Sequence, residues 1–526
     1  MKYLIANHVG CCRRTSLLAT ALVSFVAAMV LFSAARGTAQ QLIPANGFYS
    51  GRPHADDFTA ESLRHYTASL RDQYGGDYRK VPLAVKAEFF EWALWRYHLT
   101  AYNQVLNRVQ LPDQPGVRPA PQVSPDTSTW NGALLAALCY QYAVTHSDQT
   151  LHRIAVLLDG LRFYTTATDR PGCYARCVVP ESTQIRRHEA EKFGLYRYRS
   201  PDGETYSLLG SPAKGTYNQL AFGYASLLMF AYDDLPADVQ SRVRQDVTQL
   251  VMHVLRDDYH ITDVNGRRTA HGDLTPVIAS VGVPFNGQVA YHVVALGRYF
   301  PSDDPVADQV IQRQFHRLRE KRHAYYKDPH KSLVTPQRVG DNPLVKGMND
   351  RNHVTNAAYS GLALDVDQSR RSGRPLNRQF MFQLGRTMYW SMRRIGGHRN
   401  ALCNFMWAGI LSEPQNREMI VRRRESVEVT GQIARGLTDG VEQLRRFRLD
   451  RFHRPGRYVE TKKLQWVDQQ NPDDYVWKAN PKSTIKPTGT ATNIHTAAID
   501  YLVAYWIFRY YELQKHPALA DHHSVL

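Results

Sequence analysis

Residues 132–145 read GALLAALCYQYAVT, a continuous run of apolar and small side chains. Its apolar residues recur at helical spacing, and its small residues share one face of the expected helix. A second helical pattern at 156–166 follows after a short turn, so the two segments predict a pair of helices. The same spacing recurs at 220–232, 238–257, 289–299, 306–326, 357–364, 380–394, 403–411 and 497–513. These patterns predict an all-α fold.

Strand-like alternation is rare in this sequence. The one convincing hairpin is predicted at 259–271, where Asp263-Val264-Asn265-Gly266 is a hairpin-type turn. Residues 172–211 are rich in Arg, Pro and Gly. We expect this stretch to be a long irregular loop that crosses one face.

Helices that arrive in pairs, joined by long polar loops, favour an α/α toroid, which is an incomplete ring of helical hairpins. In such a ring the inner helices present a concave face, and loops at one rim build the site. We expect residues 41–526 to form one such domain, with little β structure and a wrapping segment near 446–490. A helical solenoid is the alternative, but no fixed repeat period is visible in the sequence.

Length and composition exclude several classes of protein. The chain has 526 residues, of which 43% are hydrophobic, and this balance excludes a disordered, collagen-like or coiled-coil chain. The formal net charge is +17, and it is still +13 without the first 40 residues. A basic surface favours anionic partners. Because no nucleic-acid motif accompanies the charge, we expect an acidic polysaccharide or oligosaccharide as partner, and no nucleic acid.

The N-terminus has the features of a targeting segment. Arg13 and Arg14 precede an uncharged stretch at 15–35, and small residues follow that a signal peptidase could recognise. The apolar run is longer than that of a usual signal peptide. Residues 1–40 are therefore predicted to be a cleaved signal peptide or an uncleaved membrane anchor, and either one places the body of the protein in the periplasm or outside the cell.

Four cysteines lie outside the targeting segment. Cys173 and Cys177 are close enough in sequence for a small disulfide-closed loop, and two independent buried thiols are the equal alternative. Cys139 and Cys403 lie in apolar runs and are expected in the core. No Cys/His set has zinc-site spacing, and we expect no metal and no cofactor.

The stretch 350–359 is the first candidate for chemistry. Asn352, Asn356 and Tyr359 fall on one stripe of a helix, and His353 lies beside it. So many polar groups on an otherwise small-residue helix are costly to bury without a purpose. A capped helix start with a satisfied histidine is the alternative.

Four further segments contain candidates. Asn404 and Trp407 share a helix face after Arg399, and Tyr217 or Gln219 is expected at the rim of a cavity. Capping is the alternative role for the asparagines near 400–404 and for Thr216. Trp130 is either a sugar-stacking platform or a core side chain, and Asp126 is either a helix cap or a site carboxylate. The aromatic residues of 474–481 and 497–511 either bind carbohydrate or pack.

Common catalytic motifs are absent from the sequence. It has no phosphate-binding loop, no His-Glu-x-x-His element and no Gly-x-Ser-x-Gly element. These absences argue against a nucleotide-hydrolysing enzyme, a zinc protease and a serine hydrolase.

Scattered pieces of the chain resemble a group of exported bacterial helical proteins. They include Trp130-Asn131-Gly132, Asn352-His353, Arg399-Asn400 with Cys403-Asn404-Phe405, and Tyr505-Trp506 with Arg509-Tyr510-Tyr511. That group implies an acidic residue near Asn218, where this chain has an amide. The sequence more distantly resembles the α/α-toroid polysaccharide lyases and glycoside hydrolases. Toroid lyases use a nearby Asn and His with a Tyr and an Arg. This resemblance implies catalytic roles for Asn352, His353, Tyr217, Tyr359 and Arg399.

The predicted function is cleavage of a uronate-containing polysaccharide by β-elimination. An amide or Arg neutralises the sugar carboxylate, His353 removes the C5 proton and a Tyr protonates the leaving oxygen. The predicted substrate-binding residues are Trp130, Asn356, Asn404, Trp407 and Gln219.

Two alternatives from other classes remain open at this point. A glycoside hydrolase needs two opposed carboxylates, and the candidates for them are Asp126, Asp263, Asp350 and Asp500. A non-catalytic carbohydrate- or envelope-binding protein would instead have an aromatic groove without an acid/base pair.

Overall fold

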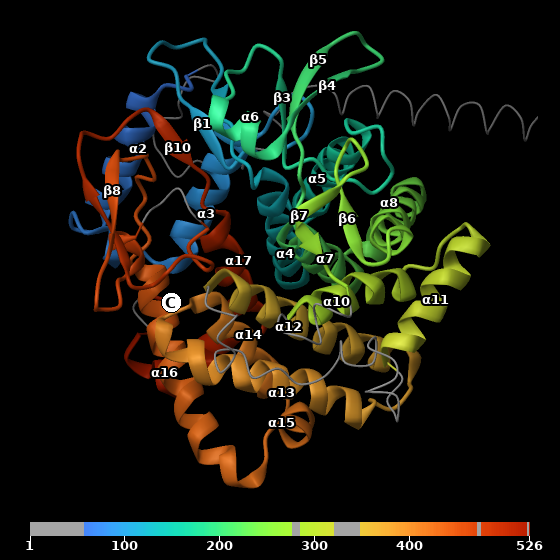
Figure 1. The fold of residues 1–526 in the computed structure, drawn as a ribbon. Helices are drawn as coiled ribbons and strands as arrows, with labels where there is room; N and C mark the ends of the chain where they lie inside the picture. The colour runs from blue at the N-terminus through green and yellow to red at the C-terminus, as the bar shows by residue number, and fades with distance from the viewer. Residues whose placement is uncertain (1–56, 276–284, 320–347, 471–474, 523–524) are drawn as a thin grey trace, which may run out of the picture. The chain divides into compact units, whose positions relative to one another are not determined.

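The structure, a computed structural model, describes residues 57–275, 285–319, 348–470, 475–522 and 525–526. The described residues are mostly helical and carry four small β-sheets (Figure 1). The all-α prediction is therefore confirmed at the level of a mainly helical chain. The predicted targeting segment 1–40 lies outside the described residues. In the part that is described, no helix is long and apolar enough to cross a bilayer.

The bounds of the helices are as follows. The first half contains α2 (Ala60–Gln73), α3 (Leu83–Ala93), α4 (Thr127–Thr145), α5 (Asp148–Thr166), α6 (Arg187–Phe193), α7 (Lys214–Phe230) and α8 (Ala237–Arg256). The second half contains α10 (Phe285–Tyr299), α11 (Pro305–Arg319), α12 (Met348–Ser372), α13 (Arg378–Ile395), α14 (Ala401–Ser412), α15 (Pro414–Ile420), α16 (Ser426–Arg445) and α17 (Ile499–Tyr510). Every helix predicted above has a counterpart among them, although the last residues of 306–326 are not described.

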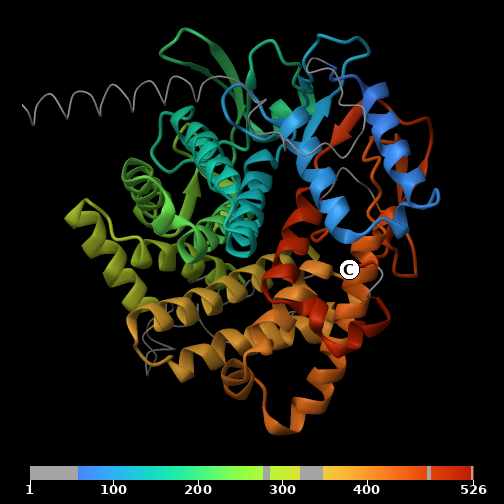
Figure 2. The same cartoon turned by 180° about the vertical axis from the view of Figure 1, so that it is seen from behind.

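Helices α4 and α7 pack closely along their length, as Figures 1 and 2 show from opposite sides. Two glycines permit this approach. A Cβ on Gly132 would lie 2.7 Å from the carbonyl oxygen of Gln219, and a Cβ on Gly223 would lie 2.6 Å from the carbonyl oxygen of Gly132. The backbones can touch only because neither residue has a side chain. This contact brings the beginnings of the two helices together.

The remaining helices pack on this pair and on one another. α17 packs on α4, α10 and α12 pack on α7, and α14 packs on α12 and α17. A second set lies against these helices, with α5 on α4, α8 and α11 on α10, α13 on α12, and α16 on α14. The burial pattern follows from the sequence, because α8 and α16 are amphipathic whereas α4, α7 and α14 are buried almost all round.

The stretch 172–211, which we expected to be an irregular loop, is instead largely β structure. β3 (Cys177–Pro180), β4 (Leu195–Arg199) and β5 (Thr205–Leu209) form an antiparallel sheet in the order β3-β5-β4. The alternation of Tyr and Arg in β4 is a strand pattern, but both of its faces remain at least partly exposed. It therefore lacks the alternation of apolar and polar residues by which a half-buried strand is recognised.

Three further small sheets complete the fold. The predicted hairpin is confirmed, because β6 (His260–Thr262) pairs with β7 (Arg268–Asp273) across a turn in which Gly266 has a φ of +80°. β8 (Gly456–Glu460) pairs with β9 (Ser483–Pro487) inside the predicted wrapping segment. β1 (Arg108–Gln110) pairs with β2 (Ala120–Pro121) and with β10 (Ile494–Thr496), so a strand near the C-terminus joins the N-terminal part.

The four described cysteines are free thiols, all of them buried. Cys177 packs with Val123, Val179 and Leu209, and Cys173 faces the carbonyl oxygen of Thr262 at 3.6 Å. The structure therefore favours two independent buried thiols over a disulfide-closed loop.

Candidate functional site

A cavity of about 410 Å³ lies where several helices begin. Segments that are distant in sequence meet around it. The helices α4 and α7 with their caps contribute Asp126, Thr129, Trp130, Ala133, Ala213, Lys214, Gly215, Thr216 and Gln219 to its lining. The other lining residues are Arg176 directly before β3, His271 of β7, Asn352 and His353 of α12, and Tyr475 and Lys478. Four of the ten predicted site residues are among them: Asn352, His353, Trp130 and Gln219.

The first turn of α7 forms one wall of this cavity. Its N-cap is Ala213, which provides no side-chain acceptor for the first N–H groups of the helix. The N-terminal end of a helix carries partial positive charge. Thr216, which the sequence allowed as the cap, lies inside the helix and contacts Thr129 of α4 through its hydroxyl at 3.1 Å. The capping interpretation of Thr216 is wrong, because the helix begins two residues earlier, at Lys214.

A carboxylate between two cations forms a second wall. Asp126 Oδ1 lies 3.0 Å from Arg176 Nη1, and its Oδ2 lies 2.6 Å from Lys478 Nζ. Burial acts to raise the pKa of Asp126, but Lys478 and Arg176 outweigh it, and the pKa is held below its ordinary value. Asp126 stands at the N-cap position of α4 without a capping hydrogen bond. Its carboxylate therefore lines the cavity, and the structure favours a site carboxylate over a helix cap for Asp126.

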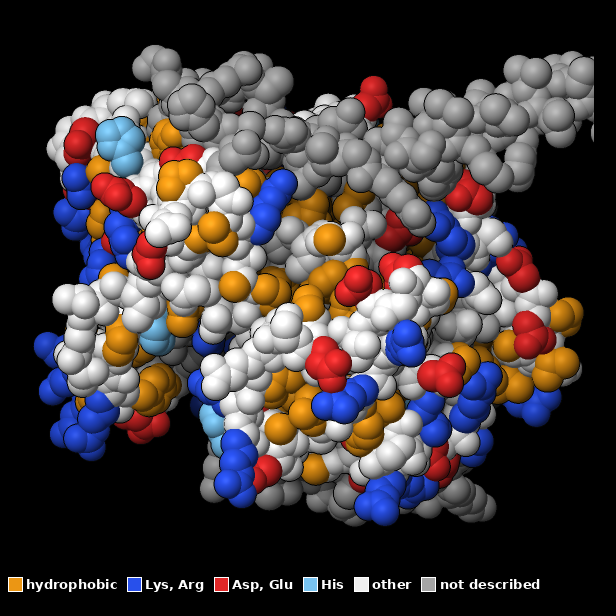
Figure 3. All heavy atoms as spheres, turned by 90° about the horizontal axis from the view of Figure 1, so that it is seen from above, with side chains coloured by type: hydrophobic (Ala, Val, Ile, Leu, Met, Phe, Trp, Pro, Cys, Tyr) orange, Lys and Arg blue, Asp and Glu red, His pale blue; other side chains and the backbone are white. Residues whose placement is uncertain are grey.

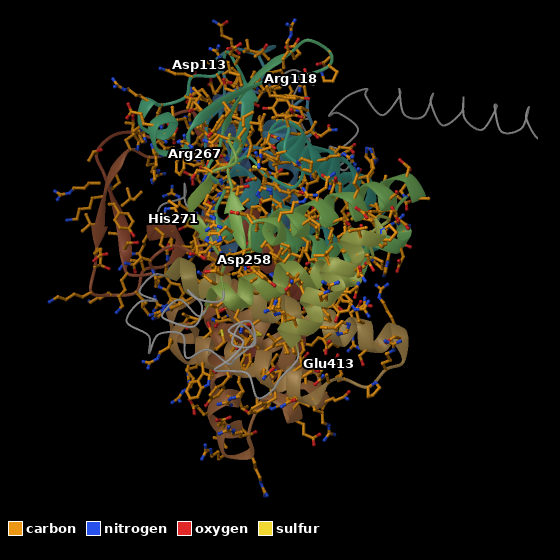
Figure 4. The ribbon with its side chains drawn as sticks, turned by 45° about the vertical axis from the view of Figure 1, so that its right-hand side comes forward. Asp113, Arg118, Asp258, Arg267, His271 and Glu413 are labelled. Atoms are coloured by element: carbon orange, nitrogen blue, oxygen red, sulfur yellow. The ribbon has the colours of Figure 1, made fainter. Side chains whose placement is uncertain are left out.

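Two further basic side chains line the cavity. Lys214 is the first residue of α7, and His271 is an exposed residue of β7, the strand on which Figure 4 labels it. Burial, Arg176 and Lys214 together lower the pKa of His271. The ring is therefore mostly neutral at pH 7. Three permanent cations and one carboxylate give the cavity a net positive charge.

Uncharged polar groups are buried at the α7–α12 side of the cavity. Asn352 is 2% exposed, and its Oδ1 has no hydrogen-bond partner within the described residues. Gln219 is also 2% exposed and accepts a hydrogen bond from Asn356 at 3.1 Å, while its Nε2 has no described partner. Buried polar groups in proteins are normally paired. The unpaired acceptor of Asn352 and the unpaired donor of Gln219 are themselves buried, so they lie directly behind the cavity surface.

His353 lies between this polar region and the cations. Its Nδ1 lies 3.3 Å from Asn218 Nδ2, and its Nε2 faces Gly215, where an added Cβ would lie only 2.7 Å away. Burial, helped by Lys478 and Lys214, lowers the pKa of His353 to about 3. The imidazole is therefore neutral at pH 7.

Neither tyrosine predicted to be catalytic lines the cavity. The hydroxyl of Tyr217 donates to the carbonyl oxygen of Gly172 at 2.6 Å. Tyr359 is completely buried, and its hydroxyl lies 2.5 Å from that of Tyr140 and 3.0 Å from that of Tyr511. Both side chains pack in the helical core. The tyrosine that does line the cavity is Tyr475.

The other predicted residues also lie elsewhere. Arg399 stacks on Trp466 at 3.7 Å from its ring centre. Asn404 donates to the carbonyl oxygen of Gly436 at 3.1 Å and so joins α14 to α16. Trp407 is buried in α14. Asn356 lies behind Gln219 and does not line the cavity.

Trp130 lines the cavity but offers it little surface. The side chain is 3% exposed, and its ring meets that of Tyr475 edge to face at 5.1 Å between centres. A sugar-stacking platform needs an open ring face. The position favours the core alternative for Trp130, with one edge at the cavity.

Lys214 and His271 line the cavity and were not predicted as site residues from the sequence. Three more cavity residues were also missed: Arg176, Lys478 and Tyr475. Each lies in a segment that the sequence pointed to, since Tyr475 and Lys478 belong to the aromatic stretch 474–481 and Arg176 lies between the two cysteines. In each of these segments, the residue that was missed is the one that contacts residues far away in the sequence. Lys478 and Asp126, for example, are 352 residues apart.

The face shown in Figure 3 has no single basic patch, and the described His, Cys, Asp and Glu residues form no metal site. On the face shown in Figure 3, Lys and Arg side chains are mixed with Asp and Glu and do not form one basic patch. Within the described ranges, no three His, Cys, Asp or Glu residues group in a way that could hold a metal ion. Comparison of the chain with models of known protein families and with curated proteins finds no match.

Proposed function

We propose that the chain is an exported enzyme that cleaves an acidic, uronate-containing polysaccharide by β-elimination in this cavity. The observation that carries the proposal is the composition of the lining. Arg176, Lys214 and Lys478 stand near the amide of Asn352 and the imidazole of His353. Residues 1–40 are proposed to direct the export of the chain.

An α/α toroid is the proposed architecture. The contacts follow a closed succession, from α4 to α7, α10, α12, α14, α17 and back to α4. Two neighbouring helices of this succession run parallel when the residue numbers of their contacting pairs increase together. Between α4 and α7, Thr129 contacts Thr216 and Leu135 lies close to Gly223. Between α14 and α17 with its C-cap, Phe405 contacts Phe508 and Gly409 lies close to Tyr511. Parallel inner helices with a second set outside them support a ring whose inner helices begin at one rim.

The cations supply the first requirement of an elimination. The proton at C5 of a uronate becomes removable when the adjacent carboxylate is neutralised. Lys478 and Arg176 are placed for this task, because they already hold the carboxylate of Asp126 in the same cavity. The amide of Asn352 adds a hydrogen-bonding group without a charge.

The imidazoles of the lining supply the second requirement, which is a base. His271 and His353 both have a lowered pKa, so each can be neutral at pH 7 as a base must be. Burial raises the pKa of Tyr475 well above its ordinary value and keeps its phenol protonated, but the hydroxyl oxygen is itself buried, so Tyr475 lines the cavity with its ring and not with an acid. These properties support proton transfer in the cavity without a metal ligand set.

The carboxylates favour elimination over hydrolysis. Asp126 is the one described carboxylate in the lining, and two cations already pair with it. Asp263 accepts from Tyr196, and Asp500 is buried beside Arg451. The side chain of Asp350 lies outside the description. A hydrolase would need a second carboxylate across the cavity from Asp126.

The test uses a panel of acidic polysaccharides and follows the ultraviolet absorbance of an unsaturated uronate. We expect absorbance to rise with at least one of them. Lys478→Ala should raise KM at least tenfold. In this variant Asp126 remains paired with Arg176, whereas the substrate carboxylate can no longer bind the ammonium group of Lys478. Lys482→Ala, an exposed lysine of the same segment outside the cavity lining, should leave KM unchanged.

Two other outcomes would contradict the proposed reaction. Reducing ends that appear without absorbance would identify a hydrolase. If binding is measured by calorimetry without any cleavage across the panel, the chain is a carbohydrate-binding protein.

A further inference from the structure

Three buried polar side chains stand in a row behind the cavity. His292 of α10, Asn218 of α7 and His353 of α12 are 0%, 0% and 5% exposed. His292 Nδ1 lies 3.0 Å from Asn218 Oδ1, and Asn218 Nδ2 lies 3.3 Å from His353 Nδ1. The row therefore ends at the ring that lines the cavity.

The direction of these hydrogen bonds follows from one backbone carbonyl. Asn218 Nδ2 lies 3.2 Å from the carbonyl oxygen of His353, which can only accept. The amide nitrogen must therefore face His353, and its second hydrogen points to Nδ1. The amide oxygen then faces His292, whose Nδ1 must donate to it.

The same direction fixes where His353 carries its proton. A ring nitrogen that accepts from an amide has no hydrogen of its own, so Nδ1 is bare. A neutral imidazole then carries its hydrogen on Nε2. That nitrogen faces the cavity over Gly215, and no hydrogen bond to it is present among the described residues.

We propose that Asn218 is a positioning residue that holds His353 in the Nε2–H form, so that His353 donates a hydrogen bond to the ligand of the cavity and does not remove a proton from it. This inference rests on the proposed function for the identity of the ligand, a uronate. His271 is then the imidazole that is left to act as the base. The expectation that His353 is the base is thereby replaced.

A neutral donor suits this position. Lys478 and Lys214 oppose a positive charge on His353, and Asp126 alone among the nearby charges favours one. A fixed N–H can still stabilise an oxygen that gains negative charge in the transition state. Because His292 donates to the amide that in turn donates to His353, each hydrogen bond strengthens the next.

The test reads the protonated nitrogen directly, by nuclear magnetic resonance of the full chain labelled with ¹⁵N-histidine, without substrate. The chain has 21 histidines, and the signal missing in His353→Gln identifies the ring. We expect a protonated Nε2 and a bare Nδ1 at pH 7. A protonated Nδ1 overturns the proposal, whatever the enzyme assay shows.

Two variants test the role of Asn218. Asn218→Ala removes the amide and should produce a mixture of the two neutral forms. Asn356→Ala removes a buried asparagine that bonds Gln219 and does not contact His353, so it should leave the Nε2–H signal unchanged. An unchanged signal in a folded Asn218→Ala variant overturns the positioning role, and if that variant does not fold, the wild-type signal alone decides.

Addition of D-glucuronate separates this inference from the proposed function. We expect the Nε2 signal of His353 to shift as the sugar binds. An Nε2–H form that does not respond to glucuronate would support the role of Asn218 in fixing the proton and overturn donation to a uronate. Failure of the polysaccharide assay would leave the tautomer measurement intact.

Discussion

At the scale of single residues, Gly215 controls access to His353. Its Cβ position is 2.7 Å from Nε2 and 2.8 Å from Cε1 of the imidazole. Because Asn218 holds the ring from behind, the ring has little freedom to give way. The absence of a side chain at Gly215 is therefore what leaves Nε2 open to a ligand.

Gly215→Ala should reduce kcat/KM by about 10- to 100-fold, because a methyl group displaces the ring or covers Nε2. The melting temperature should change little, since the clash involves one ring and no backbone. Gly431→Ala is the control, because Gly431 is also helical and a Cβ there meets only the Arg435 side chain at 3.4 Å. Wild-type kcat/KM in Gly215→Ala would show that Nε2 has no part in the reaction.

At the scale of secondary-structure elements, the close contact of α4 and α7 links the stability of the helical core to the site. Both helices begin at the cavity, and backbone meets backbone at Gly132 and Gly223. A side chain at either position would force the helices apart over several turns. Asp126, Thr129 and Thr216 would then lose their present spacing.

Gly223→Ala should lower the free energy of unfolding by about 1–3 kcal/mol, because its Cβ would lie 2.6 Å from a carbonyl oxygen and 3.1 Å from the Leu135 side chain. Denaturant unfolding measures this change. Gly431→Ala should instead raise stability slightly, by about 0.5–1 kcal/mol, as alanine favours a helix over glycine. Equal effects of the two changes would refute the close contact.

The elements that could be predicted from the sequence are those with a clear hydrophobic period or a characteristic turn. α8 was predicted within one residue at each end, because its valine and leucine stripe alternates with a charged face. The β6–β7 hairpin was predicted from its turn alone. The sheet of β3, β5 and β4 was not, since both faces of β4 are partly exposed and its pairing with β5 depends on contacts outside the strand.

At the scale of the whole molecule, the cavity depends on segments that the sequence keeps far apart. The Asn352-His353 pair could be predicted as part of the lining, because many polar side chains gather where a helix of otherwise small residues begins. Arg176 and Lys478 could not be predicted, because each becomes a site residue only by meeting Asp126. Local patterns also placed Tyr359 at the site, whereas the packing of three tyrosine hydroxyls places it in the core.

Buried neutral histidines should make the whole molecule sensitive to acid. Burial lowers the pKa of four of them to about 3 or 4, compared with 6.5 in an unfolded chain: His98, His253, His292 and His353. Between pH 6.5 and pH 4 the unfolded chain binds more protons at these sites than the folded one does. Stability is therefore fully present above pH 6.5 and is lost as the pH falls.

Several described carboxyl groups act in the opposite direction, because burial raises the pKa of Asp246 and also that of Glu88, Asp159, Asp367, Asp439 and Asp500. Burial raises the pKa of Asp246 from 3.8 to about 7, although Arg162 opposes the shift, so its contribution to stability is lost as the pH rises from 4 to 7. The four histidines, joined by His495 with its own strongly lowered pKa, outweigh Asp246 and the carboxyl groups with smaller shifts. The net dependence on pH should reach on the order of several kcal/mol per pH unit, since each fully engaged site contributes about 1.4 kcal/mol per unit.

The free energy of unfolding, measured by denaturant titration at pH 7.5, 6.5, 5.5 and 4.5, should fall slightly from 7.5 to 6.5 and steeply below 6.5. Asp246→Asn removes the opposing carboxyl group with the largest shift, so the decline of this variant below pH 6.5 should be steeper than that of the wild type. Stability that stays constant down to pH 4.5 would mean that these histidines are accessible to protons in the folded state. The neutral state of His353, on which its donor role depends, would then be lost in mild acid.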